Sequence, residues 1–128
     1  MDERFSEHGL FSWNELITPD AEAAKKFYVE LLGWELEDMP LKNTTYSVIK
    51  AKGHDIGGIM NMPRGVAGAP ARWLPYVTVD DVEMAVRQAA KLGAKVIRLP
   101  TDIPEVGRYA VLEDPQMAEF AVITYLKK

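Results

Sequence analysis

The sequence predicts an α+β fold made of two similar halves, each with the element order β-α-β-β-β. Three observations predict it. Residues 13–20 lead into a helical pattern that ends at Leu32-Gly33, and about sixty residues later 74–81 lead into a second one that ends at Leu92-Gly93. Each pattern is followed by short β-like segments that glycine and proline divide. An internal repeat of this kind indicates a duplicated module with a shared cavity where the halves meet.

Composition limits the classes of protein to consider. A chain of 128 residues with 48% apolar side chains can bury the core of one domain. No apolar run approaches the ~18–20 residues that span a bilayer, and the start has no signal-peptide pattern, so we expect a cytoplasmic protein that binds no membrane. The absence of cysteine excludes disulfides, thiolate metal sites and a cysteine nucleophile. Fifteen basic against nineteen acidic residues argue against nucleic acid as a partner.

The first half begins with an alternating segment, 11–18, which is typical of a strand. Residues 1–9 before it are polar and are expected to be frayed. Thr18 as N-cap and Pro19 in the first turn predict the start of a helix, and Gly33 predicts a left-handed end. The predicted buried stripe of this helix consists of Ala24, Phe27, Tyr28 and Leu31.

Three further strands complete the first half. Lys52-Gly53 reads as a hairpin turn, and the adjacent Gly57-Gly58 inside the last strand suggest a bulge or a surface that something approaches closely. Trp34 joins Phe27 and Tyr28 as an expected core residue. The predicted strands are 34–39, which Pro40 stops, 45–51 and 56–62, and the linker is 63–70.

The second half repeats the plan. Asp80 followed by Glu83 resembles a capping box at the start of the helix. Trp73 is expected to pack toward the helices. The predicted apolar stripe is Val82, Ala85, Val86, Ala89 and Leu92. The predicted strands are 73–79, 95–99, 108–113 and 119–125, with a stiff loop at 100–104.

In this order and spacing the chain resembles the vicinal oxygen chelate superfamily, also called the glyoxalase/bleomycin-resistance/dioxygenase fold. The likeness covers about Phe11 to Tyr125 and extends to a glyoxalase-related, antibiotic-biosynthesis-hydroxylase-like branch. The residues that carry it are Asp20-x-x-x-Ala24-x-x-Phe27-Tyr28-x-x-x-Leu32-Gly33-Trp34, Asp80-Asp81-Val82, Leu92-Gly93-Ala94, Gly107-Arg108 and Asp114-Pro115-Gln116-x-x-x-Phe120, with Trp13-x-Glu15-Leu16 and Ile103-Pro104 for the branch.

The resemblance implies two βαβββ modules whose mixed eight-stranded sheet curls into a cup flanked by helices. It implies a single domain over 1–128, with module one at about 10–62, the linker at about 63–70 and module two at about 72–126. Met117 stands where the family usually has glycine, so the geometry of that turn is left open.

The resemblance also implies where metal ligands would stand, and this chain departs from the pattern there. Its ligand positions fall on Trp13, Leu74 and Ala121, and the last strand of module one, 56–62, contains no histidine, aspartate or glutamate. Vicinal-oxygen chemistry needs a divalent ion on histidine and carboxylate ligands. We therefore expect no metal and no other cofactor. A divalent metal enters only with the alternative function, on residues outside these positions such as His54 with Asp55.

Glu15 is the most informative titratable residue, because strand alternation places it with Trp13 and Ile17 on the face that lines the cup in the family. It could act as a general base, anchor a ligand or make a structural pairing. Tyr46 and Tyr109 lie on neighbouring strands with unknown facing. The expected ligand-binding residues are Trp13, Glu15, Met60, Leu74, Tyr76, Ala121 and Ile123.

These observations favour a metal-free protein that binds a small aromatic or partly apolar molecule in the cup, as drug-sequestering relatives do. The alternative is a glyoxalase- or dioxygenase-related enzyme, a lyase or oxidoreductase, with Glu15 as base or a metal at other positions. A third reading is an interaction module with a filled cup. We expect a homodimer, with the modules paired within one chain or swapped between two.

Overall fold

A computed structural model describes residues 3–41, 44–62 and 70–126. Eight strands and two α-helices confirm the predicted α+β fold. The chain divides into two compact units, Trp13–Leu74 and Met1–Ser12 with Pro75–Lys128. The division follows Leu74, whereas the predicted linker lies, except for Pro70, outside the described residues. No helix in the described ranges is long and apolar enough to cross a membrane.

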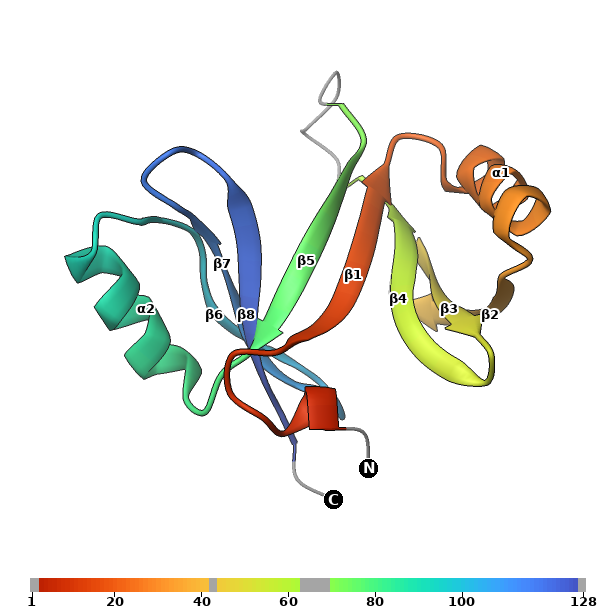
Figure 1. Cartoon of the computed structure of the whole chain (residues 1–128). Helices are drawn as coiled ribbons and strands as arrows, with labels where there is room; N and C mark the ends of the chain where they lie inside the picture. The colour runs from red at the N-terminus through yellow and green to blue at the C-terminus, as the bar shows by residue number, and fades with distance from the viewer. Residues whose placement is uncertain (1–2, 42–43, 63–69, 127–128) are drawn as a thin grey trace. The chain divides into compact units, whose positions relative to one another are not determined.

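The unit Trp13–Leu74 contains one helix and four strands in the order β2-β3-β4-β1 (Figure 1). β1 runs parallel to β4, and the other pairs are antiparallel. Positive φ angles at Lys52 (52°) and Gly53 (79°) form the predicted hairpin turn. The elements are β1 (Phe11–Thr18), α1 (Ala21–Leu32), β2 (Glu35–Leu41), β3 (Thr44–Ala51) and β4 (His54–Asn61).

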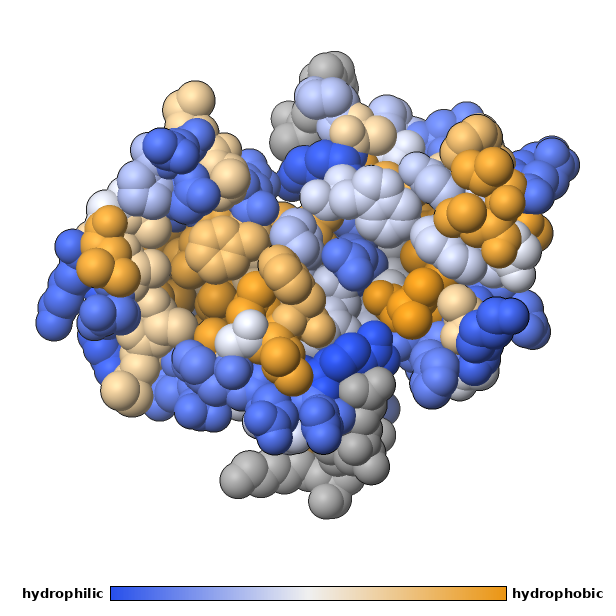
Figure 2. All heavy atoms as spheres, viewed as in Figure 1, coloured by the Kyte–Doolittle hydropathy of each residue, from blue (hydrophilic) through white to orange (hydrophobic). Residues whose placement is uncertain are grey.

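Helix α1 contributes a narrower face to the core than its pattern predicts. Ala24 and Tyr28 pack against a buried cluster from α1 and the strands. Phe27 and Leu31 are 58% and 62% exposed, so the prediction that they are buried is wrong. They form the adjacent i, i+4 row of the helix, which turns away from the strands once Ala24 and Tyr28 face them. Figure 2 shows hydrophobic residues at the surface over α1. The buried cluster is Leu16, Ala21, Ile49 and Ile59.

Both helices begin one or two residues later than the sequence predicts. The Asp20 side chain, rather than Thr18, accepts from the Ala23 backbone N–H at 3.1 Å. Asp81, rather than Asp80, accepts from Met84 N–H at 3.1 Å. The N-cap carboxylate accepts from a first-turn N–H that has no partner within the helix. Its negative charge also interacts favourably with the positive end of the helix dipole. Gly33 has the predicted left-handed φ of 71°.

The other unit has four strands in the order β5-β8-β7-β6, of which β5 belongs to it only after Leu74 (Figure 1). β5 is parallel to β8, and the remaining pairs are antiparallel. β6 continues through the predicted loop at 100–104 as far as Ile103, with two register shifts. The elements are η1 (Glu3–Phe5), β5 (Arg72–Thr78), α2 (Val82–Lys91), β6 (Lys95–Ile103), β7 (Gly107–Glu113) and β8 (Glu119–Tyr125).

The core of this unit lies between α2 and its strands. Ala85, Val86 and Ala89 pack against it as the stripe predicts, whereas Leu92 is 68% exposed because the helix ends before it. β6 contains Pro100 and two register shifts, and proline is unusual inside a strand, so the sequence predicts a strand that ends before it. The buried core residues are Val79, Val82, Ala110, Leu112 and Val122.

The segment before β1 is held in place, so the prediction that residues 1–9 are frayed is wrong for residues 3–9. The Phe5 ring meets the Tyr125 ring edge-on at 4.9 Å. Gly9 N–H donates to the Thr78 carbonyl at 2.7 Å, and Thr78 N–H donates to the Leu10 carbonyl at 2.9 Å. A half-buried aromatic contact and backbone hydrogen bonds order a segment that its polar composition alone would leave frayed.

The turn between β7 and β8 stores backbone strain at Met117. Its φ is 74°, in the left-handed region, and its side chain is 76% exposed. We expect Met117→Gly to raise the free energy of unfolding by about 1 kcal/mol, because glycine adopts this φ without a Cβ clash and no packing is lost. Chemical denaturation measures it. Gln116→Gly is the matched control and should lower stability, since glycine there only adds freedom to the unfolded chain.

Asp38 gives the fold an acid-sensitive contact. The Ser47 hydroxyl donates to Asp38 Oδ1 at 2.6 Å across β2 and β3, and this bond lowers the pKa of Asp38 below its ordinary 3.8. The ionised form therefore stabilises the fold above about pH 4, and that contribution is lost as the pH falls through the lower folded value. We expect Asp38→Asn to reduce the stability difference between about pH 6 and pH 2.5. Equal acid sensitivity of Asp38→Asn and wild type in denaturant titrations would contradict this role.

Candidate functional site

Strand β1 presents its side chains alternately to the two faces of the unit Trp13–Leu74. Leu16 packs with Ile49 and Ile59 in the cluster that α1 covers. Because successive side chains of a strand point to opposite faces, Trp13 and Glu15 lie on the face away from α1. Both are half-buried. The predicted shared facing of these two residues thus holds in the structure.

A chain of two hydrogen bonds joins three side chains on this face. The Trp13 indole N–H donates to the Tyr46 hydroxyl oxygen at 2.9 Å. The Tyr46 O–H in turn donates to Glu15 Oε1 at 3.0 Å. Each donor fixes the orientation of the next group, and the carboxylate receives a bond from a phenol that is itself polarised by an indole. We call Trp13, Tyr46 and Glu15 the relay.

Gly58 makes the relay possible. Tyr46 lies on β3, and β4 separates that strand from β1. In the register Gly58 is opposite Glu15 on one side and Val48 on the other. A Cβ at Gly58 would lie 2.0 Å from the Tyr46 hydroxyl oxygen. The missing side chain therefore leaves the space through which the phenol crosses β4 and reaches β1.

Gly57 also has to be a glycine, but its missing side chain makes room for backbone on the opposite face of β4. A Cβ on Gly57 would lie 2.2 Å from the backbone oxygen of Asn14. The glycine pair thus supports two close approaches, one by a side chain and one by a backbone. The predicted close approach at this pair is confirmed. The predicted bulge lies beside it, because Ile49 pairs with Gly57 while Lys50 pairs with Asp55, which leaves Ile56 of β4 as the extra residue.

The remaining predicted ligand-binding residues fall into separate groups. Met60 lies opposite Ile17, two residues beyond Gly58, and so on the face of the relay. Leu74 is 3% exposed. In the other unit Tyr76 faces Tyr109, with ring centroids 6.0 Å apart. Their strand neighbours in register are Ala121 and Ile123, both buried. That all of these line one ligand site stays a prediction.

The residues at the family's metal positions do not fit a metal ion. Trp13 is a hydrogen-bond donor to Tyr46, and Leu74 and Ala121 are buried and apolar. β4 begins at His54, earlier than predicted, so it does contain His54 and Asp55, but both are exposed, and Asp55 accepts from Lys50 Nζ at 2.6 Å. In the described part of the chain, no three histidine, aspartate or glutamate residues are grouped to hold a metal.

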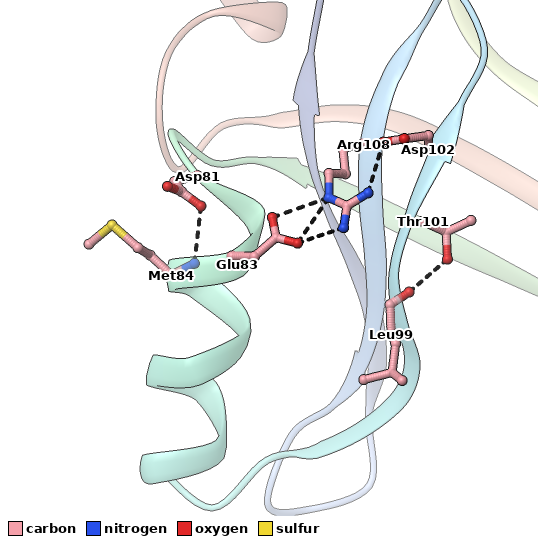
Figure 3. Close-up of polar contacts among 7 residues, drawn as sticks. All are labelled: Asp81, Glu83, Met84, Leu99, Thr101, Asp102 and Arg108. Atoms are coloured by element: carbon pink, nitrogen blue, oxygen red, sulfur yellow. Dashed lines mark hydrogen bonds and ion pairs between the residues drawn. The ribbon is translucent and has the colours of Figure 1, made fainter.

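A second polar centre, in the other unit, is an ion-pair clamp (Figure 3). The Arg108 guanidinium donates from Nε and Nη2 to Glu83, the shortest distance being 2.7 Å, and from Nη1 to Asp102 at 2.9 Å. These bonds raise the pKa of Arg108 and lower that of Glu83. The clamp borders a cavity of about 520 Å³ and ties α2 to β6 and β7. Glu83 therefore serves Arg108 and not the predicted capping box.

The sequence predicts Trp13 and Glu15 as site residues, but it does not predict Tyr46, which connects them. Tyr46 had no assigned facing, because β3 is separated from β1 along the chain by two other elements. The signal in the sequence is the glycine pair. A glycine inside a strand often marks a place where a neighbouring group occupies the space of the missing side chain. Tyr109 was missed for a similar reason and lies beside the predicted Tyr76.

Residues 10–122 match the model of the Glyoxalase/Bleomycin resistance protein/Dioxygenase superfamily. The chain belongs to this superfamily. The resemblance expected from the sequence is therefore confirmed, and the match covers both βαβββ halves of the superfamily domain.

Two curated relatives extend this comparison. The putative glyoxylase CFP32 of Mycobacterium tuberculosis is 40% identical over 119 residues, which are 92% of this chain and 45% of that protein. The anthracycline biosynthesis protein DnrV of Streptomyces peucetius is 32% identical over 127 residues, 89% of this chain and 46% of that protein. The chain spans about half the length of the curated relatives it matches.

Solved structures show the same fold at low identity. Methylmalonyl-CoA epimerase from Mycobacterium tuberculosis superposes with a TM-score of 0.69 at 11% identity, over 93% of this chain and 89% of that one. The Mn(II)-bound glyoxalase from Novosphingobium aromaticivorans gives 0.61 at 20% identity, over 89% of this chain and 38% of that one. At these identities the likeness concerns the fold alone.

Proposed function

We propose that this superfamily domain binds a small, planar, partly apolar organic molecule at the relay and does so without a metal. The observation that carries the proposal is the hydrogen-bond chain from Trp13 through Tyr46 to Glu15. It sets an aromatic surface beside an oriented carboxylate. Such a pairing of apolar contact area with a few fixed polar groups is typical of small-molecule sites.

The chemistry of the three side chains defines the ligand class. Trp13 offers a ring face for stacking, which favours a flat aromatic molecule. Glu15 is an acceptor when ionised, so a ligand with an O–H or N–H donor gains a charge-assisted hydrogen bond. A relative in anthracycline biosynthesis is consistent with a flat, hydroxylated aromatic ligand. The ligand we propose is thus an aromatic hydroxyl compound or a close equivalent.

The first test uses 2-naphthol, which has a flat ring and one donor, in calorimetric titrations of the purified chain. We expect saturable binding to wild type. Trp13→Ala should abolish it because the stacking surface is lost. Tyr46→Phe should weaken it by roughly tenfold, because Glu15 loses the donor that orients it.

The matched control is Phe27→Ala, which truncates an exposed aromatic on α1, away from the relay face. Its affinity for 2-naphthol should equal that of wild type. Unchanged affinity in Trp13→Ala, or equal losses in Trp13→Ala and Phe27→Ala, would contradict a site at the relay.

A second candidate function is proton transfer by Glu15, and the Tyr46–Glu15 hydrogen bond favours it. A carboxylate held by a phenol is oriented for attack on an acidic C–H beside a carbonyl group. The C–H bond would break, its proton would pass to Glu15, and the electron pair would form an enolate. This reading corresponds to the glyoxalase- or dioxygenase-related enzyme that the sequence left as its alternative.

Hydrogen–deuterium exchange separates the two functions. We propose 2-tetralone in deuterated buffer, followed by proton NMR, as a general probe of such a base. Faster exchange with wild type than with Glu15→Gln would support catalysis. Glu22→Gln changes an exposed glutamate of α1 and is the control, which should behave as wild type. Equal exchange rates with all three proteins and in buffer without protein would contradict catalysis and leave binding as the function.

We also propose that the chain acts as a homodimer in the cytoplasm. Large apolar side chains are exposed on several elements, among them Phe27, Leu31 and Leu99. A second copy could cover such surfaces. Sedimentation at micromolar concentration tests it, and a single species of 14.4 kDa would contradict it.

A further inference from the structure

The unit Trp13–Leu74 carries an aromatic cluster on the face that α1 covers. Tyr28 of α1 stacks on Trp34 with ring centroids 5.5 Å apart and planes 18° apart. Trp73 stands nearly perpendicular to both, at 82° and 83°. Its indole N–H donates to the Tyr28 hydroxyl at 3.3 Å. Rings from α1, from the connection between α1 and β2, and from β5 thus hold one another in a defined arrangement.

A cavity of about 240 Å³ lies beside this cluster. Trp34 and Trp73 form two of its walls, and their planes meet at 83°. Their centroids are 6.1 Å apart, so the two rings touch and form a corner. A planar ring in this corner can meet one wall face to face and the other edge to face, which are the two favourable aromatic geometries. None of the lining residues is charged, so the lining favours a neutral occupant. The lining is Asn14, Trp34, Ile49, Ile56, Gly57 and Trp73.

Asn14 supplies the one polar side chain of this lining. Its amide makes no side-chain hydrogen bond with residues 3–41, 44–62 or 70–126. It lies opposite Gly57 in the register of β1 and β4. Because Gly57 has no side chain, nothing from that position fills the cavity beside Asn14. A primary amide offers one donor group and one acceptor, so it can pair with another amide in both directions.

This cavity is separate from the relay. Asn14 stands between Trp13 and Glu15 in β1, so its side chain points to the opposite face of the strand. Ile49, another lining residue, belongs to the buried cluster under α1. A ligand in the cavity and a ligand at the relay therefore contact different side chains.

We propose that the cavity is a second binding site, for a small neutral aromatic molecule that carries an amide or a similar donor–acceptor pair. Its ring lies in the corner formed by Trp34 and Trp73, and its amide pairs with Asn14. The size of the cavity suits one ring and one short polar group rather than a large ligand. The site goes beyond the function proposed for the relay and does not depend on it.

The test is a titration with benzamide, followed by NMR of the ¹⁵N-labelled full chain. The three tryptophans give three indole N–H signals, which single substitutions assign. Benzamide should shift the signals of Trp34 and Trp73 and the backbone amide of Gly57. Asn14→Ala should weaken binding about three- to tenfold, since one amide pairing is lost while the walls remain.

Gln88→Ala is the matched control, because like Asn14→Ala it removes a side-chain amide, but from an exposed position on α2 in the other unit. It should bind benzamide as wild type does. Trp34→Ala should abolish binding, and Asn14→Ala keeps the test valid if Trp34→Ala does not fold. The proposal is overturned if benzamide shifts only the Trp13 signal, if it shifts none, or if Asn14→Ala binds it as tightly as wild type.

Discussion

Gly58→Ala is expected to weaken 2-naphthol binding by roughly a hundredfold while leaving the protein folded. The new Cβ would overlap the phenol of Tyr46, at 2.0 Å from its oxygen and 2.2 Å from Cζ. The phenol is the far end of a flexible side chain, so it can swing aside at small cost to the fold. It would then lose both of its relay contacts, to Trp13 and to Glu15. Two lost hydrogen bonds, one of them to a carboxylate, imply a loss of affinity of roughly a hundredfold.

A double-mutant cycle shows whether this effect acts through Tyr46. In a Tyr46→Ala background the added methyl group has nothing to displace, so Gly58→Ala should change affinity little further. Titration calorimetry of the four proteins measures the coupling. Additive losses would mean that Gly58 acts on the ligand in another way and would count against the relay as the binding group.

Gly57→Ala is expected to have the largest effect on stability of any substitution considered for this chain. Its Cβ would lie 2.2 Å from the Asn14 backbone oxygen and 3.2 Å from its carbonyl carbon. Backbone cannot move aside as a side chain can, so the parallel pairing of β1 with β4 must shift. We expect the free energy of unfolding to fall by about 3 kcal/mol, a large share of the marginal stability of a small domain.

Urea denaturation of Gly57→Ala and Gly58→Ala side by side provides the comparison. The two substitutions are chemically identical and adjacent, and only the atoms they meet differ. Gly57→Ala should lose much more stability, whereas Gly58→Ala should lose more affinity. Equal stability losses would contradict the assignment of backbone contact to one glycine and side-chain contact to the other.

The fold was predictable because its signals are local. Alternation over 11–18, the helix end at Gly33 and the Lys52-Gly53 turn each depend on a few adjacent residues. The helix starts were less well predicted, since Thr18 and Asp20, or Asp80 and Asp81, are all competent caps. The backbone geometry before each helix decides which of them caps it, and this geometry cannot be read from the sequence.

The relay was only half predictable, for reasons that are tertiary. Strand alternation places Trp13 with Glu15, because both lie on one strand. The arrival of Tyr46 depends on strand order, on register and on the missing side chain of Gly58. The order of residues 3–9 likewise depends on Phe5 meeting Tyr125, a residue 120 positions later in the chain. Exposure of Phe27 depends on which row of α1 faces the strands.

We propose that the relay binds a small aromatic molecule and needs no metal to do so. The most direct measurement is an NMR titration of the chelator-treated, ¹⁵N-labelled chain with 2-naphthol. The indole N–H of Trp13 donates to Tyr46, so its signal reports on the relay itself. We predict that 2-naphthol shifts this signal saturably and that added Zn²⁺ or Mn²⁺ changes neither the shift nor the affinity. An unmoved Trp13 signal, or one that moves only after metal is added, would contradict the claim.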